Sequence, residues 1–191
     1  MEGSDKKKQS YFPPDLFLFL NKTKKLSPEE SWNSLSNEKL WQYNLHYFDD
    51  LTAVNAEERN ESHEDLIDSW IVKNPVGIGE GWEAYPLSLR IVNWIKWHLW
   101  GNSLSESFKR SLVIQIRFLN KTIEYHLLGN HLFENAKALI FGGLFFYGDE
   151  PDKWLNKGLC ILTKELKEQI LIDGGHFELS PLYHSIVLEG I

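Results

Sequence analysis

Residues 154–170 read WLNKGLCILTKELKEQI, and this stretch decides the fold class. Its large aliphatic residues recur every three or four positions, which is the spacing of one face of an α-helix. They are Leu155, Leu159, Leu162, Leu166 and Ile170. The sequence DGG at 173–175 follows and should end the helix, because glycine readily adopts the left-handed conformation found at helix C-termini. The stretch therefore predicts one long amphipathic helix.

Four further segments carry helical signals. Pro86 suits the first turn of a helix whose face holds Leu87, Ile91, Ile95 and His98 or Leu99. A second face comprises Phe108, Leu112, Ile116, Leu119 and Ile123, and a third begins with Ala136, Leu139, Ile140 and Gly143. A last helix should start at Ser180, where a serine cap precedes Pro181.

Strand-like alternation is almost absent and the connections are short, so we expect an all-α chain of antiparallel helix pairs. The pairs could stack as a bundle, a solenoid or a closed ring. Residues 1–38 are rich in Lys, Ser, Pro and Asn, which predicts a loosely ordered lead-in with one short helix after SPEE. Residues 39–191 should form one helical domain. The final apolar segment has no stop signal, so we expect the chain to be truncated at its C-terminus, the front of a longer protein.

Composition narrows the class of partner. The chain has 20 Lys plus Arg against 27 Asp plus Glu, a net charge of −7, which opposes binding to nucleic acid. Its four arginines, Arg59, Arg90, Arg110 and Arg117, are few for a densely sulfated ligand. No apolar run approaches the ~20 residues of a membrane span, and the lysines at 6–8 precede a run broken by prolines, which is a poor export signal. We expect neither a nucleic-acid nor a membrane partner.

The cysteine and aromatic content limit which kinds of site the chain can form. Cys160 is the only cysteine, which excludes an intrachain disulfide and a cysteine-based zinc site, and we expect no metal and no cofactor. Aromatic residues make up 14% of the chain. They can be large core residues or flat rings on which sugars stack in a concave site.

The first polar cluster lies in EYHLLGNHLFENAKAL, residues 124–139. Gly129 can end one helix and Asn130 can cap the next. His131 and Glu134 are three residues apart, so their side chains can meet on one helix face. Capping alone could explain Asn130, and an exposed ion pair could explain the other two.

The second cluster lies in GGHFELSPLYHSI, residues 174–186. The helix start at Ser180 places Tyr183 and His184 in the first turn, where the helix dipole favours negative charge. The dipole and a nearby histidine can lower the pKa of Tyr183 from its ordinary value of about 10 toward that of a useful base. The alternative is a half-buried aromatic residue that packs at the start of the helix.

The third cluster is NPVGIGEGWEAYPLSLRIVNW, residues 74–94. Its glycines allow close backbone approach, and Trp82, Tyr85 and Arg90 could provide a stacking surface with a clamp for a carboxylate. The alternative is a loop packed down by Trp82.

Four stretches follow one another along the chain, NLHYFDDL, GEGWEAYPLSLRIVNW, GNHLFENAKAL and GGHFELSPLYH, and the last two are specific in combination. Together they resemble the N-terminal helical domain of the heparinase II/III-like polysaccharide lyases, over roughly residues 40–191. The resemblance implies an incomplete α/α toroid of antiparallel helical hairpins, as in chondroitin AC and alginate lyases. In that family a β-sandwich follows, which this chain lacks and which is its expected partner. Members are often periplasmic.

The resemblance implies β-elimination on a uronic-acid polysaccharide and gives the residues roles. Asn130 and His131 match the family's Asn-His pair, Glu134 its helix-borne glutamate and Tyr183 its catalytic tyrosine. Asn130, with His131 or Glu134 beside it, would neutralise the uronate carboxylate while Tyr183 removes the C5 proton. Substrate contacts are expected from the remaining candidates, Trp82, Tyr85, Arg90, His184 and Glu178. In parts of the family a further histidine comes from the sandwich.

Two other functions stay open. One is a non-catalytic carbohydrate-binding fragment that keeps the groove without turnover. The other is a glycoside hydrolase on a similar helical ring, with Glu134 and Glu178 as its paired carboxylates.

Overall fold

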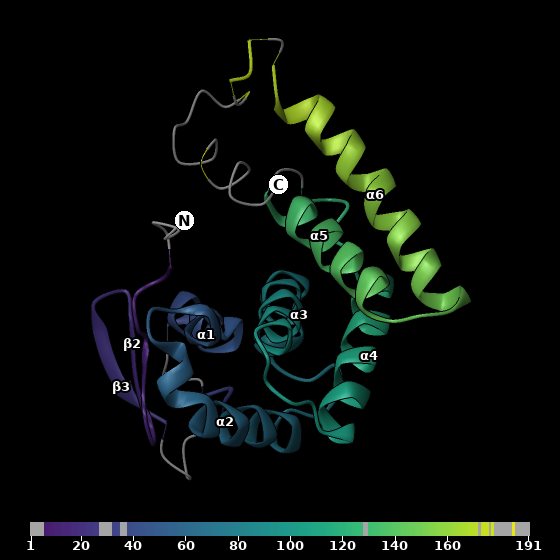
Figure 1. The fold of residues 1–191 in the computed structure, drawn as a ribbon. Coiled ribbons are helices and arrows are strands. Elements are labelled where there is room, and N and C mark those ends of the chain that lie inside the picture. Colours follow the sequence, from purple (N-terminus) through teal and green to yellow (C-terminus); the bar gives the residue numbers. More distant parts are fainter. Residues whose placement is uncertain are drawn as a thin grey trace. The chain divides into compact units, whose positions relative to one another are not determined.

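The computed structural model describes residues 6–26, 32–34, 38–127, 130–171, 173–175, 177 and 185. The chain divides into two compact units, Met1–Gln115 and Ile116–Ile191. Helices predominate in both, and α4 (Glu106–Lys121) has residues in each (Figure 1).

The first unit begins with a small antiparallel sheet that the sequence did not predict. Its strands are β1 (Tyr11–Phe12), β2 (Leu16–Phe19) and β3 (Lys22–Lys25), in the order β1-β2-β3. Phe17 and Phe19 are buried, and β2 packs against α1 (Lys39–Tyr47). The expectations of an all-α chain and of a loosely ordered lead-in are therefore wrong for residues 11–25.

Aromatic side chains form the core of the first unit. Around it lie α1, α2 (Asn60–Lys73), α3 (Ala84–Leu99) and the short 3-10 helices η1 (Asp49–Thr52), η2 (Ala56–Arg59) and η3 (Glu80–Trp82). Five tryptophans are at most 1% exposed: Trp32, Trp41, Trp70, Trp94 and Trp97. The ring of Trp94 meets that of Trp70 edge-on at 5.6 Å and that of Phe108 at 4.8 Å. Much of the aromatic excess is thus core in this unit.

The second unit contains the end of α4 and the antiparallel pair α5 (Asn130–Phe145) and α6 (Asp149–Gln169), which run side by side in Figure 1. Two glycines allow their close contact. A Cβ on Gly158 would lie 2.8 Å from the carbonyl oxygen of Ala136, and one on Gly143 would lie 2.7 Å from the backbone nitrogen of Leu155. Both distances are too short for a side chain, so glycine is required at this crossing.

The predicted helix over residues 154–170 is confirmed, but its leucine face is not the buried one. The buried residues of α6 are Pro151, Trp154, Gly158, Ile161, Glu165 and Gln169, whereas Leu159 is 44% exposed. Contact with α5 through Gly158 turns this narrower face inward. The helix expected from Ser180 lies outside the described residues. Within the described ranges, no helix is both long and apolar enough to cross a membrane.

Candidate functional site

The polar cluster of the second unit lies at the start of α5. That helix begins at Asn130, and α4 ends at Lys121, so the two are separated by a connection rather than by a single glycine break. The connection folds back onto α5, because the backbone N–H of Glu124 donates to Oδ1 of the fully buried Asn135 at 3.0 Å. This hydrogen bond holds the second turn of α5 against the segment that precedes the helix.

His131 pairs with a carboxylate from this connection. Its Nδ1 lies 3.0 Å from Oε2 of Glu124, and the two side chains are 37% and 16% exposed. A carboxylate on one ring nitrogen fixes the orientation of an imidazole. The sequence prediction missed Glu124 as a partner, although it is the first residue of the stretch that contains His131. The spacing rule for helices does not reach across a loop.

Glu134 forms its ion pair with Lys137 rather than with His131. The Lys137 Nζ donates to Oε1 of Glu134 at 2.8 Å, and Glu134 is 4% exposed. The expected meeting of His131 and Glu134 is therefore not the arrangement found. His131 and Lys137 each lie three residues from Glu134, so helical spacing allowed either of them to pair with it. The long lysine side chain reaches the buried carboxylate of Glu134, while Glu124 holds the imidazole of His131.

In the first unit, Trp82 packs the glycine-rich segment onto α1. It is 5% exposed, and its Nε1–H donates to the carbonyl oxygen of Asn74 at 3.3 Å. Gly81 lies so close to His46 that a Cβ would stand 2.6 Å from the imidazole Nδ1. The glycines do allow close backbone approach. Trp82, however, is a packed core residue and does not offer a sugar-stacking surface, so that expectation is wrong.

Arg90 is also buried and cannot act as a carboxylate clamp in this arrangement. It has no exposed surface; its Nε–H donates to Oε1 of Gln115 at 2.9 Å and its Nη1 to the carbonyl oxygen of His46 at 3.3 Å. The guanidinium lies 3.8 Å from the ring centroid of Trp70. Burial lowers the pKa of Arg90 well below its ordinary value. Arginine at this position of α3 faces the core, which periodicity alone could not distinguish from the surface.

Tyr85 is half-buried and keeps some exposed surface. Its ring meets that of Tyr47 edge-on at 6.0 Å. Nearby, the hydroxyl of Tyr43 donates to Glu83, whose other oxygen accepts from Lys39 Nζ at 3.0 Å. Burial and the Glu83 hydrogen bond raise the pKa of Tyr43 to about 12, so this tyrosine is not a ready base. Of Trp82, Tyr85 and Arg90, Tyr85 is the one that a ligand could reach.

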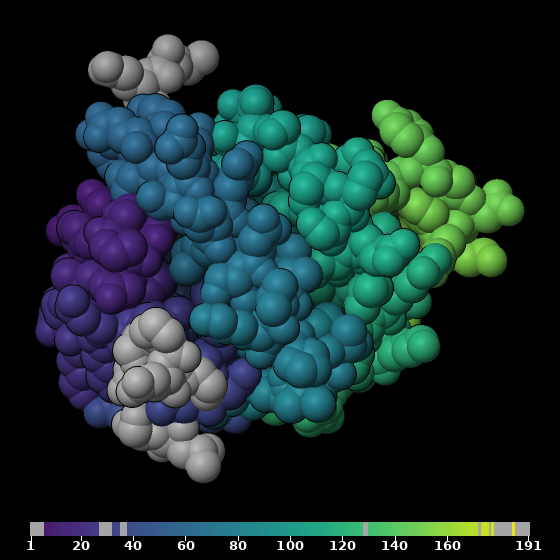
Figure 2. Space-filling view, turned by 90° about the horizontal axis from the view of Figure 1, so that it is seen from below, coloured from purple at the N-terminus to yellow at the C-terminus, as the bar shows by residue number. Residues whose placement is uncertain are grey.

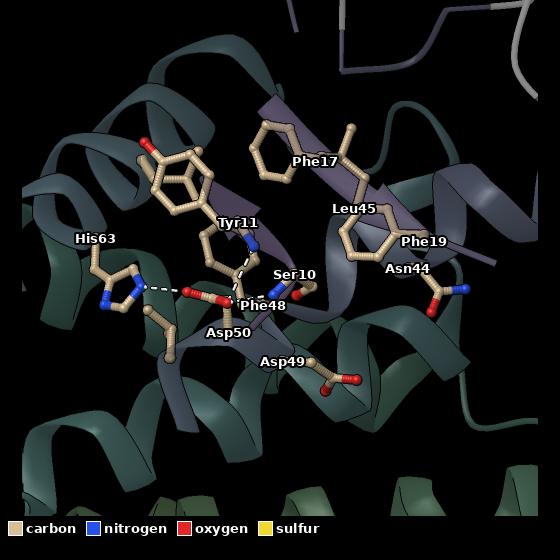
Figure 3. A pocket seen from close by; sticks show the side chains of 12 residues that line it. Ser10, Tyr11, Phe17, Phe19, Asn44, Leu45, Phe48, Asp49, Asp50 and His63 are labelled. Carbon is tan, nitrogen blue, oxygen red and sulfur yellow. Dashed lines mark hydrogen bonds and ion pairs between the residues drawn. The ribbon is translucent and has the colours of Figure 1, made fainter. Parts of the chain in front are cut away.

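A buried acid–imidazole pair lies elsewhere in the first unit, around a small cavity (Figure 3). Asp50 accepts hydrogen bonds from the backbone N–H groups of Ser10 and Tyr11, at 2.6 and 3.0 Å, and lies 2.9 Å from His63 Nε2. Arg59 Nε–H donates to the same carboxylate at 3.0 Å. Burial favours the protonated acid, but these hydrogen bonds and the Arg59 charge outweigh it and lower the pKa of Asp50.

The cavity beside Asp50 has a volume of about 10 Å³, which holds one water at most. No sugar fits there. We interpret the cluster as a structural joint that ties the N-terminal segment to α2. Among the residues that the structure describes, no group of three or more His, Cys, Asp or Glu side chains is placed to hold a metal ion.

Three candidates, Tyr183, His184 and Glu178, lie outside the described residues, and their roles stay predictions. Sequence comparison covers them. The family described as "Heparinase II/III N-terminus" matches residues 9–191, nearly the whole chain. The chain belongs to this family.

Heparin-sulfate lyases are among the relatives of this heparinase II/III chain. A heparin-sulfate lyase of Pedobacter heparinus is 29% identical in an alignment 136 residues long, which covers 63% of this chain and 20% of that protein. A heparin-sulfate lyase of Bacteroides stercoris is 41% identical over 61 residues, 31% of this chain and 9% of that protein. The solved structure called "Crystal Structure of Heparinase III" matches with a TM-score of 0.65 at 24% identity, over 85% of this chain and 28% of that one. The last likeness concerns the fold, and each match spans less than a third of the longer protein.

Proposed function

We propose that this heparinase II/III chain is the helical part of a polysaccharide lyase that cleaves a uronic-acid polysaccharide by β-elimination. The observation that carries the proposal is the family match over residues 9–191, together with the Asn130–His131 corner at the start of α5. The relatives named heparin-sulfate lyases support a polysaccharide substrate. We further propose that the helices belong to an incomplete α/α toroid.

The corner at the start of α5 would receive the uronate carboxylate. Removing the C5 proton is difficult because the adjacent carboxylate resists additional negative charge. The amide of Asn130 can donate hydrogen bonds to that group. Because Nδ1–H of His131 is turned to Glu124, His131 would donate from Nε2–H as an imidazolium, and the two donors would stabilise the enolate-like intermediate. Glu124, 3.0 Å from His131, would hold the ring in place.

Tyr183 would act as the base. Its phenolate takes the C5 proton, the electron pair of that bond forms a C4–C5 double bond, and the C4–oxygen bond breaks. The phenol can then return its proton to the leaving glycosidic oxygen. The elimination therefore needs no other reactant.

Glu134 would act through the position of α5 rather than on the sugar. It is 4% exposed and paired with Lys137, which supports a role behind the Asn130–His131 corner. The same burial disfavours the alternative of a glycoside hydrolase, because a catalytic carboxylate must reach the scissile bond.

The rest of the site is proposed to come from a longer protein. The aligned relatives extend far beyond the matched region, with 20% and 9% of their lengths covered. A β-sandwich following the helices would contribute further substrate contacts. The chain of 191 residues should therefore turn over substrate far more slowly than a version extended into the downstream reading frame.

The test is an ultraviolet absorbance assay on heparan sulfate, heparin and alginate, with the extended protein. Elimination leaves an unsaturated uronate that absorbs, whereas hydrolysis does not. We expect His131→Ala to lower the rate about 10²–10⁴-fold. The matched control is His126→Ala, since His126 is an exposed histidine in the connection that precedes α5. No absorbance on any of the polymers, with a folded protein, would favour the non-catalytic carbohydrate-binding alternative.

A further inference from the structure

The first unit contains a second cavity, which shares no lining residue with the one beside Asp50 and which none of the proposed chemistry uses. It measures about 240 Å³, many times the roughly 10–15 Å³ that one water needs. Three buried apolar side chains line it, Ile67, Trp97 and Phe108. Exposed polar residues form its rim, with Glu64 and Asp68 on α2 facing Ser103 and Ser105 from the α3–α4 connection. The cavity is thus large enough to accept an apolar side chain from outside.

The rim belongs to a strongly acidic surface. Six carboxylates lie on η2 and α2, all exposed: Glu57, Glu58, Glu61, Glu64, Asp65 and Asp68. None of these six forms an ion pair with another described residue. The two basic residues among them, Arg59 and His63, are buried and turned toward Asp50. Figure 2 views the molecule from below, the side on which α2 lies in Figure 1.

The acidic surface around the apolar cavity favours a positively charged partner. Adjacent like charges without counter-charges cost free energy that an oppositely charged partner recovers. A polyanionic polysaccharide would be repelled here, so the surface does not serve the proposed lyase site.

We propose that the cavity lined by Ile67, Trp97 and Phe108, together with its acidic rim, forms a groove that is a docking site for a basic amphipathic peptide segment of a partner protein. One apolar side chain of the segment would fill the cavity above Ile67, and flanking lysine or arginine side chains would pair with Glu64 and Asp68. Charge complementarity selects this partner over a polysaccharide, and the apolar floor selects it over a simple cation.

The test measures peptide binding to the 191-residue chain by fluorescence anisotropy. The probe is a short labelled peptide that alternates lysine and leucine. Two comparison peptides replace leucine by serine or lysine by glutamate. We expect the lysine–leucine peptide to bind, with an affinity that falls as salt increases, and the other two to bind at least tenfold more weakly, roughly as expected when the apolar or the charged part is lost.

Variants separate the groove from general acidity. Glu64→Gln with Asp68→Asn should weaken binding about tenfold, whereas the matched pair Glu57→Gln with Glu61→Gln, on the same surface but outside the cavity, should change it less than about twofold. Ser103→Trp should fill the cavity from its exposed rim and abolish binding, while Ser103→Ala keeps it. Circular dichroism checks that each variant folds.

Three results would overturn the proposal. They are equal binding of the leucine-free peptide, equal loss in the two double variants, and undiminished binding to a folded Ser103→Trp protein. Each would reduce the site to nonspecific attraction by a negative surface.

Discussion

His46 makes a sharp prediction about acid stability. It is fully buried, and the Nε1–H of Trp70 donates to its Nδ1 at 3.0 Å. Because an indole only donates, that imidazole nitrogen must be unprotonated and the ring neutral. Burial, with a second contribution from the Arg90 charge, lowers the pKa of His46 from 6.5 to about 3.

The sign of the effect follows from proton uptake. Between pH 6.5 and about 3 the unfolded chain binds a proton at His46 that the folded chain does not. The stability conferred by the neutral ring is therefore complete above pH 6.5 and is lost as the pH falls. At about pH 4.5, two units below the unfolded value, the loss is about 3 kcal/mol, at 1.36 kcal/mol per unit.

The matched variant is His46→Asn, whose Oδ1 can accept from Trp70 but does not titrate. Urea unfolding, followed by tryptophan fluorescence at about pH 7 and 4.5, gives the free energy of unfolding. The wild type should lose about 3 kcal/mol more than the variant between these conditions. Carboxylates titrate in both proteins and cancel in the comparison. Equal losses in the two proteins would refute the assignment of a buried neutral imidazole.

Three other substitutions test the packing and the corner. Asp50→Asn should destabilise the first unit by about 3–5 kcal/mol in thermal unfolding, since it leaves Arg59 and His63 buried without their counter-charge; a loss under about 1 kcal/mol would contradict the joint. Gly158→Ala should cost about 1–3 kcal/mol, because its Cβ would lie 2.8 Å from a carbonyl oxygen of α5, and a neutral effect on the urea midpoint would show that the helix pair can separate freely. Glu124→Gln should lower the elimination rate of the extended protein about tenfold with little change in KM, if Glu124 orients His131, and an unchanged rate would remove that positioning role.

Periodicity predicted the long helices correctly. Leu87, Ile91 and Ile95 of α3 and Leu112, Ile116 and Leu119 of α4 are all at most 1% exposed, because one apolar stripe per helix faces a core. The sheet was missed for a local reason. Its hairpin turn uses Leu20 and Asn21 at positive φ, 53° and 59°, without the glycine that normally signals such a turn.

The candidate site divides in the same way. Its position at the start of α5 was predictable, since Asn130 does begin a helix. The side-chain partners were not, because Glu124 reaches His131 across a loop and Lys137 competes for Glu134. Trp82 and Arg90 are amphipathic residues that serve a core or a surface equally well, and here tertiary packing buries both.

The central claim is that this family member belongs to an eliminative enzyme whose Asn130–His131 corner receives the uronate. Mass spectrometry of the products from a defined uronate oligosaccharide tests it directly, with the extended protein and its Asn130→Ala variant. The account predicts product pairs whose masses sum to that of the substrate, with the rate lowered about 10²–10³-fold in the variant. Products that together exceed the substrate by the mass of one water would contradict it, as would a variant as fast as the wild type.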